Sequence, residues 1–140
     1  MMLAAWLLAI GLVVVWSTDA APAEMIAEPV AALQGLDKIT ARVSDFDARV
    51  GQPVRFGNLS IRVRACEKNP PEEPPESAAF LEIDTIRPGQ AAVREFSGWM
   101  FAQSPALASL EDPVYDVIVL DCKAPSGSPA PGSTDGNTAR

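Results

Sequence analysis

Apolar and polar side chains alternate with a period of two along much of the chain between residues 39 and 123. This is the period of a half-buried β-strand, because successive side chains of a strand point to opposite faces. Glycine, proline and asparagine divide the alternation into short runs. The runs that we expect to form strands cover residues 39–47, 53–56, 59–66, 78–83, 91–101 and 114–122. Short strands at this spacing predict an all-β fold, either a small antiparallel sandwich or a barrel.

The same pattern predicts which side chains face the core. Ile39 and Val43 should point inward from the first run. Gly57-Asn58 stands between two runs and predicts a two-residue hairpin. In the run 59–66, which follows this hairpin, strict alternation places Cys66 on the polar face, opposite the apolar side chains. The stretch Val117–Leu120 is apolar on both faces, which predicts a central position in a sheet.

The segments outside these runs have other signatures. Ser104-Pro105 predicts the start of one short helix. Four prolines within residues 69–76 predict an exposed, polyproline-like loop. Residues 24–38 are expected to be a linker with a hint of helix, because apolar residues recur there at spacings of four and three. Residues 124–140 contain no large apolar side chain, which predicts a disordered tail and leaves 39–123 as the β domain.

The N-terminus suggests export from the cytoplasm. Met1–Trp16 carries no charged side chain, and the small residues Ala21-Pro22-Ala23 follow it in the form that signal peptidases cleave. A span of 18 helical residues would cover about 27 Å, against a hydrocarbon core of about 30 Å. Residues 1–23 are therefore predicted to be a cleaved signal peptide or a retained membrane anchor. The expected location is the periplasm, with the protein either soluble or held at the inner membrane.

Composition narrows the classes of function. The chain has 18 acidic and 11 basic side chains and a formal charge of −7, which disfavours nucleic acid and anionic lipid as partners. It has no histidine, which removes histidine metal sites and the Ser-His and Cys-His catalytic pairs. Two cysteines are too few for a structural zinc site. We therefore predict no catalytic residue, no bound metal and no cofactor.

The cysteine pair has a structural explanation. Cys66 and Cys122 each end a predicted strand, and an exported chain with two cysteines is expected to contain a disulfide. A redox role is less favoured, because the chain has no Cys-x-x-Cys motif that would lower a thiol pKa. The pair is predicted to stabilise the domain.

Aromatic and basic side chains supply the candidate interaction residues. Trp99 and Phe101 together with Tyr115 would suit a groove for a ligand or a protein partner, and the alternative is that they belong to the core. Arg62 and Arg64 form a basic stripe on one predicted strand face. The stripe is expected either to pair with acids of a neighbouring strand or to bind an anionic group.

Several blocks of the sequence are distinctive. They are Ala65-Cys66, Ala79-Phe80-Leu81-Glu82-Ile83, Phe96-Ser97-Gly98-Trp99-Met100-Phe101-Ala102, Pro113-Val114-Tyr115-Asp116 and Asp121-Cys122. Together they resemble a bacterial family of exported or membrane-anchored proteins, the domain of unknown function family 2155. The family has no assigned activity. The resemblance implies a partner in a membrane complex, since genes of the family often lie near an accessory subunit of respiratory complex I.

From these observations we expect a non-enzymatic protein of the cell envelope. It would act as an accessory or binding module for a membrane-associated complex, with respiratory complex I as one candidate. Two alternatives come from other classes of function. The first is a periplasmic module that binds a ligand or glycan through Trp99 and Tyr115. The second is a small hydrolase that uses a carboxylate pair such as Glu82 and Asp84.

Overall fold

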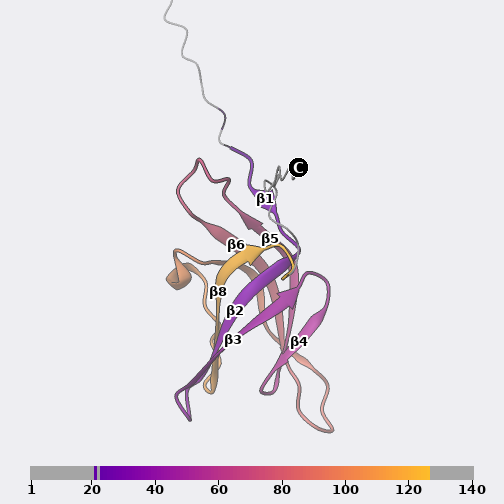
Figure 1. Ribbon diagram of the computed structural model, residues 1–140. Coiled ribbons are helices and arrows are strands. Elements are labelled where there is room, and N and C mark those ends of the chain that lie inside the picture. Colours follow the sequence, from indigo (N-terminus) through magenta and orange to yellow (C-terminus); the bar gives the residue numbers. More distant parts are fainter. Residues whose placement is uncertain (1–20, 22, 127–140) are drawn as a thin grey trace, which may run out of the picture.

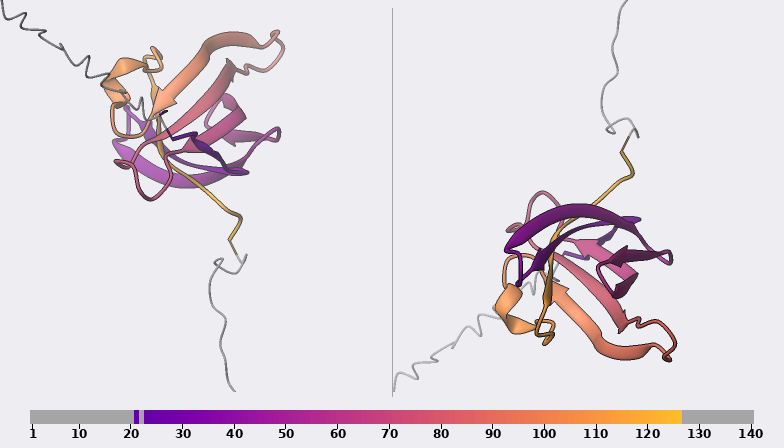
Figure 2. Two further views of the ribbon diagram at one scale, coloured as in Figure 1. Left: turned by 90° about the horizontal axis from the view of Figure 1, so that it is seen from above. Right: turned by 90° about the horizontal axis from the view of Figure 1, so that it is seen from below.

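The computed structural model describes residue 21 and residues 23–126 as two antiparallel β-sheets packed face to face (Figure 1). Views from above and below show the sheets as two layers (Figure 2). One sheet has the strand order β1-β5-β6-β7, with β4 also paired to β5, and the other has the order β3-β2-β8. The strands are β1 (Ile26–Ala27), β2 (Val30–Asp37), β3 (Arg42–Arg49), β4 (Pro53–Phe56), β5 (Leu59–Lys68), β6 (Ser77–Thr85), β7 (Val93–Phe101) and β8 (Tyr115–Lys123). The predicted all-β antiparallel class is confirmed.

The core lies between the two sheets and draws on both of them. Each contributing strand turns one apolar face inward, as a half-buried strand should. The largest fully buried side chains are Leu33, Leu59, Ile61, Val63, Cys66, Leu81, Ile83, Met100, Val117, Val119 and Cys122. Removal of this apolar surface from water, at about 25 cal/mol per Å², is the main force that holds the layers together.

Two β-bulges decide which face the cysteines occupy. The pairing of β5 with β6 skips Arg64, so Cys66 lies in the interior together with Val63. The pairing of β8 with β2 skips Leu120, and Cys122 turns inward in the same way. The prediction that Cys66 faces away from the core is therefore wrong, because alternation along one strand does not reveal a bulge.

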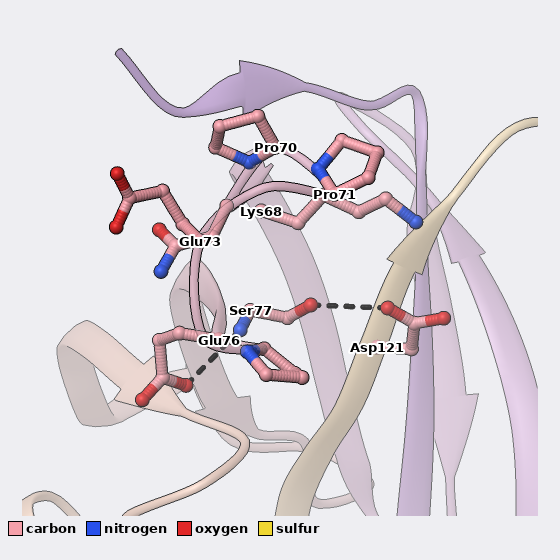
Figure 3. Close-up of a pocket in the computed structure, with 9 residues that line it drawn as sticks. Lys68, Pro70, Pro71, Glu73, Glu76, Ser77 and Asp121 are labelled. Atoms are coloured by element: carbon pink, nitrogen blue, oxygen red, sulfur yellow. Dashed lines mark hydrogen bonds between the residues drawn. The ribbon is translucent and has the colours of Figure 1, made fainter. Parts of the chain in front are cut away.

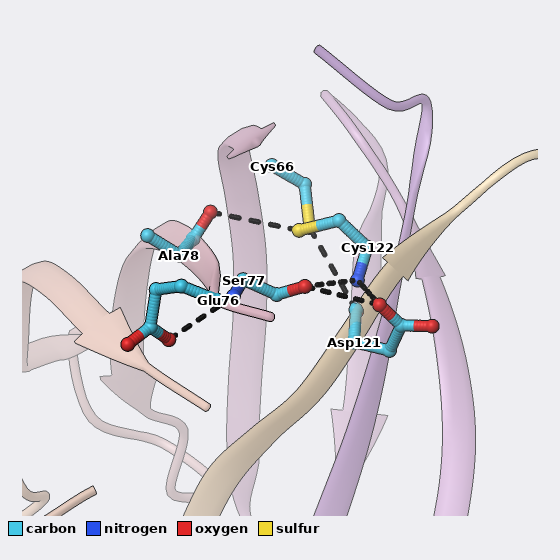
Figure 4. Close-up of a disulfide and its surroundings, with 6 residues drawn as sticks. All are labelled: Cys66, Glu76, Ser77, Ala78, Asp121 and Cys122. Atoms are coloured by element: carbon cyan, nitrogen blue, oxygen red, sulfur yellow. Dashed lines mark hydrogen bonds between the residues drawn. A yellow bond between two sulfur atoms is a disulfide. The ribbon is translucent and has the colours of Figure 1, made fainter. Parts of the chain in front are cut away.

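The predicted disulfide links the two sheets through the interior. Cys66 of β5 and Cys122 of β8 are bonded, with their Cα atoms 5.6 Å apart (Figure 4). The two residues are 2% and 0% exposed. The Sγ atom of Cys122 also lies 3.5 Å from the carbonyl oxygen of Ala78 in β6. The bond thus sits in the packed core and is shielded from solvent.

The predicted linker 24–38 contains a strand, which corrects the domain boundary. Val30–Asp37 forms β2, the middle strand of its sheet, with β3 on one side and β8 on the other. Ala31 and Leu33 point into the core. The helical spacing of apolar residues does not produce a helix here, because the two flanking strands take up the backbone hydrogen bonds of the segment. The β domain begins earlier in the chain than predicted.

Three expectations about burial are also wrong. Ile39 is 74% exposed in the turn before β3, and Val43 is exposed as well. The inward side chains of β3 are instead those of Phe46 and Ala48. β8 is an edge strand rather than a central one, and its bulged Leu120 is exposed. The apolar face of this strand thus continues partly onto the surface.

The connecting segments follow the predictions more closely. Gly57, with a φ of +56°, allows the tight Gly57-Asn58 hairpin between β4 and β5. The proline-rich segment 69–76 is a loop between β5 and β6, with its middle exposed. The predicted helix is a single 3-10 turn, η1 (Pro105–Leu107), and the nearby Leu110 is buried.

The predicted signal peptide or anchor and most of the predicted tail lie outside the described residues. Both therefore stay predictions. Within residues 23–126, no helix is long and apolar enough to cross a membrane.

Close packing of the Phe56 ring leaves room only for glycine at position 35. A Cβ atom on Gly35 would lie 2.6 Å from the Phe56 ring, whereas one on Gly98 would lie 3.5 Å from its nearest neighbour. We expect Gly35→Ala to lower the free energy of unfolding by about 1–3 kcal/mol through overpacking. Gly98→Ala, also in a strand, should leave it nearly unchanged. Urea unfolding of both variants tests this, and equal midpoints would contradict it.

Loss of the disulfide should be costly. It closes a loop between residues 56 positions apart, for which chain entropy gives about 4 kcal/mol. The double variant Cys66→Ala with Cys122→Ala should therefore unfold at a much lower urea concentration than the oxidised chain. Reductant should bring the wild-type midpoint down toward that of the variant. If reductant left the midpoint unchanged, the disulfide would not be the stabilising link described here.

Candidate functional site

The outer face of the five-stranded sheet carries a group of aromatic side chains. Phe80 of β6 lies opposite Trp99 of β7, with ring centroids 5.6 Å apart in an edge-to-face arrangement. Phe101 is two residues beyond Trp99 on the same strand and so projects from the same face. Trp99 is 38% exposed although it is the largest of the three. We call Phe80, Trp99 and Phe101 the aromatic face.

A ladder of ion pairs lies beside the aromatic face on the same side of the sheet. Glu82 accepts from Arg64 at 2.8 Å and from Arg94 at 3.4 Å. Arg94 also binds Asp84, and this hydrogen bond is the main reason that the pKa of Arg94 lies above its ordinary value. Both carboxylates named in the hydrolase hypothesis are thus held by arginines. Ladders of this kind keep neighbouring strands in register.

One member of the basic stripe predicted from the sequence, Arg64, is part of this ladder. Arg62 lies opposite Glu82 in the strand register, yet the ion pair to Glu82 comes from Arg64. The reason is the bulge at Arg64, which displaces that residue from regular pairing. The expected pairing with strand acids is therefore found for Arg64, whereas Arg62 forms no ion pair among the described residues.

Tyr115 lies elsewhere, which corrects the expectation of one groove shared with Trp99. Its ring packs edge to face against Phe56 at 5.4 Å, and Phe56 stacks on Phe46 at 5.6 Å. The Tyr115 ring also covers Gly57, whose missing side chain leaves room for it. Tyr115 is half-buried and packs against the core. Its role in the fold is to close one end of the sandwich.

A pocket of about 240 Å³ lies under the proline-rich loop (Figure 3). At its floor the Ser77 hydroxyl donates to Asp121 Oδ1 at 3.0 Å, and the same oxygen accepts from the Cys122 amide at 2.8 Å. Glu76 accepts from the Ser77 and Gln103 amides. Figure 4 shows the bonds of Glu76, Ser77 and Asp121 beside the disulfide. They are structural, since each polar group is satisfied within the chain.

Asp112 is a buried acid just before β8. It is 9% exposed, and its Oδ1 accepts from the amides of Val114 and Tyr115, both at 2.8 Å. Lys38 donates to the Asp112 carbonyl oxygen at 2.7 Å. The sequence did hold a signal, because aspartate before proline often accepts hydrogen bonds from the backbone of a turn. Asp112 thereby fixes the start of β8.

The described residues contain no group of three or more acidic or cysteine side chains placed to hold a metal ion. The outer face of the five-stranded sheet combines exposed aromatic area with charges that are paired within the chain.

Two comparisons with known proteins found matches to this chain. A family described as uncharacterized proteins conserved in bacteria, DUF2155, matches residues 31–122. The uncharacterized protein RP359 of Rickettsia prowazekii (strain Madrid E) is 29% identical over 87 residues, which cover 62% of this chain. The match spans 56% of the length of that relative. No solved structure matches the chain significantly.

Substitution of Asp112 tests its role in the fold. Asp112→Ala leaves two partly buried amides without their side-chain acceptor, which should lower the free energy of unfolding by about 1–3 kcal/mol in total. Asp112→Asn keeps a side-chain oxygen in place and should cost much less. Thermal unfolding of the two variants gives the comparison. Equal losses would show that the hydrogen bonds are not what this residue contributes.

Proposed function

We propose that this chain, which belongs to the bacterial family DUF2155, is a non-enzymatic binding module of the cell envelope. In this proposal it is an accessory or assembly subunit of a membrane-associated complex, and the aromatic face is its docking surface. The observation that carries the proposal is the exposure of Trp99 beside Phe80 on the outer face of the five-stranded sheet. Tryptophan and other aromatic residues contribute a disproportionate share of the binding energy at protein interfaces.

The charges around the aromatic face favour a protein partner over a small anion. Arg64 and Arg94 already bind Glu82, and Arg94 also binds Asp84. The arginines therefore present little uncompensated charge for a carboxylate or phosphate to neutralise. A partner would instead gain from covering aromatic surface, with the ion pairs at the rim of the interface.

Export to the periplasm is part of the same proposal. It rests on the apolar segment Met1–Trp16 and on the Ala21-Pro22-Ala23 sequence that follows it. A disulfide between Cys66 and Cys122 suits an oxidising compartment. Respiratory complex I is the candidate assembly that the family resemblance suggests.

Capture of partners from the envelope tests the proposal. The tagged full-length chain is purified from gently solubilised envelopes, as wild type, Trp99→Ala and Val93→Ala, and the bound proteins are quantified by mass spectrometry. Val93 is the matched control, since it is 52% exposed on the same strand but outside the aromatic face.

We expect a fixed set of membrane-complex subunits with wild type and with Val93→Ala. Trp99→Ala should reduce their recovery about tenfold or more, as loss of a hot-spot aromatic residue does. Equal recovery with Trp99→Ala, or no stable partner with wild type, would contradict the proposal. Enrichment of complex I subunits would identify the assembly. Enrichment of the subunits of a different complex would support a binding module but assign it another partner.

A further inference from the structure

The edge of β7 is the feature of the surface that the proposed function does not use. β7 pairs with β6 along one edge, and among the described residues no strand pairs with its other edge. Figure 2 shows β7, in orange, as the outermost ribbon of its sheet. An open strand edge is a template on which another strand can add, so proteins normally block it.

The phase of pairing shows which backbone groups are open. The Ala102 amide donates to the carbonyl oxygen of Ser77 in β6. The backbone groups of Ala102 therefore point toward β6. Successive residues of a strand direct their backbone groups to opposite edges. The N–H and C=O groups of Ser97, Trp99 and Phe101 therefore point away from β6, and no turn, loop or cap hydrogen bond among the described residues involves them.

The C-terminal part of β7 lacks the usual means of blocking an edge. Residues 96–101 contain no charged side chain and no proline, and they lie beyond the bulge at Glu95. Charges, prolines and bulges are the devices that keep open edges from pairing. Residues 96–101 are therefore suited to pair with another uncharged strand.

The other edges of the two sheets are blocked. β1 has only two residues, β3 carries charged side chains along its length, and β4 begins with Pro53. In β8, the Val117 amide donates to the Asp116 side chain at 2.9 Å, and the Cys122 amide donates to Asp121. The β8 bulge at Leu120 also interrupts regular pairing. β7 is thus the edge that the sequence leaves ready for a partner.

We infer that β7 pairs antiparallel with β7 of a second copy of this chain, about a two-fold axis at Trp99. In this register Trp99 lies opposite Trp99, and Ser97 lies opposite Phe101. All paired residues fall in the uncharged stretch, and Arg94 and Glu95 remain outside it, so no like charges are brought face to face. An isologous pair of this kind is the commonest form of homodimer.

Pairing would also extend the aromatic face. The two five-stranded sheets become one continuous sheet, and Trp99 and Phe101 of each copy project from the same side of it. Self-pairing of β7 is independent of the proposed partner protein. The homodimer is expected to form in a purified sample that contains no other protein.

Proline at position 97 is the sharpest test. The Ser97 amide points to the open edge, so Ser97→Pro should leave the pairing with β6 intact while blocking the second copy. Ser97→Thr keeps the amide and is the matched control. The mass of the purified full-length chain in mild detergent is measured by light scattering, with circular dichroism as the check of folding.

The wild type and Ser97→Thr should have twice the mass of one chain, and Ser97→Pro the mass of one. A wild type with the mass of one chain at about 100 µM, well above the concentrations at which stable dimers dissociate, would overturn the inference. So would a dimer that survives Ser97→Pro, because its interface would lie elsewhere.

A cysteine at the two-fold axis gives a second measurement that does not depend on the proline variant. Opposed Cα atoms in a hydrogen-bonded antiparallel pair lie about 5.5 Å apart, within the range that a disulfide spans. Trp99→Cys should therefore form a disulfide-linked dimer on mild oxidation. Val93→Cys is equally accessible but lies far from its counterpart, and it should not crosslink. Equal crosslinking of the two variants, or crosslinking of Trp99→Cys to a different protein alone, would overturn the inference.

Discussion

The covalent link between Cys66 and Cys122 holds the two layers of this domain together. Neither cysteine would reach the core in a regular strand. Arg64 and Leu120 each add one residue to a strand, and these bulges turn both cysteines inward from opposite sheets. A domain of this size buries a modest core, so a buried bond between its layers contributes a large share of its stability. The sheet that presents the aromatic face depends on that link.

Polar contacts around the disulfide reinforce the same region. Asp121 binds the Ser77 hydroxyl and the Cys122 amide, which connects the start of β6 to the end of β8. Glu76 ties the proline-rich loop to the backbone after β7. At the opposite end, the rings of Phe56 and Tyr115 pack over glycines and close the sandwich. The aromatic face thus lies on a sheet whose two ends are both fixed, so the proposed docking would require little ordering of the chain.

Much of the fold follows from period-two alternation, turn residues and cysteine count. These signals predicted the all-β class, the Gly57-Asn58 hairpin and the disulfide. They failed where the decisive partner lies far away in the sequence. β2 is a strand because β3 and β8 flank it, and its own spacing of apolar residues resembles a helix. A bulge such as that at Arg64 is likewise a property of a strand pair, and no single strand reveals it.

The site was predictable to a similar degree. The sequence left open whether Trp99 and Phe101 line a groove or belong to the core, and the structure places Trp99 outward beside Phe80. Tyr115 did not belong with them, since the position of one strand relative to another sheet is set by the packing of the whole domain. The open edge of β7 was not visible either, because an edge is defined by the absence of a neighbour.

Hydrogen–deuterium exchange tests most directly whether β7 is the interaction surface. The exchange of backbone amides is compared between the chain in gently solubilised envelopes and the purified chain diluted to nanomolar concentration. Peptides that cover residues 96–101 should exchange more slowly in the envelope sample, while the exposed loop at 69–76 should exchange equally fast in both. Unchanged exchange at 96–101, with slowing confined to that loop, would contradict the account and move the interface to the proline-rich end of the domain.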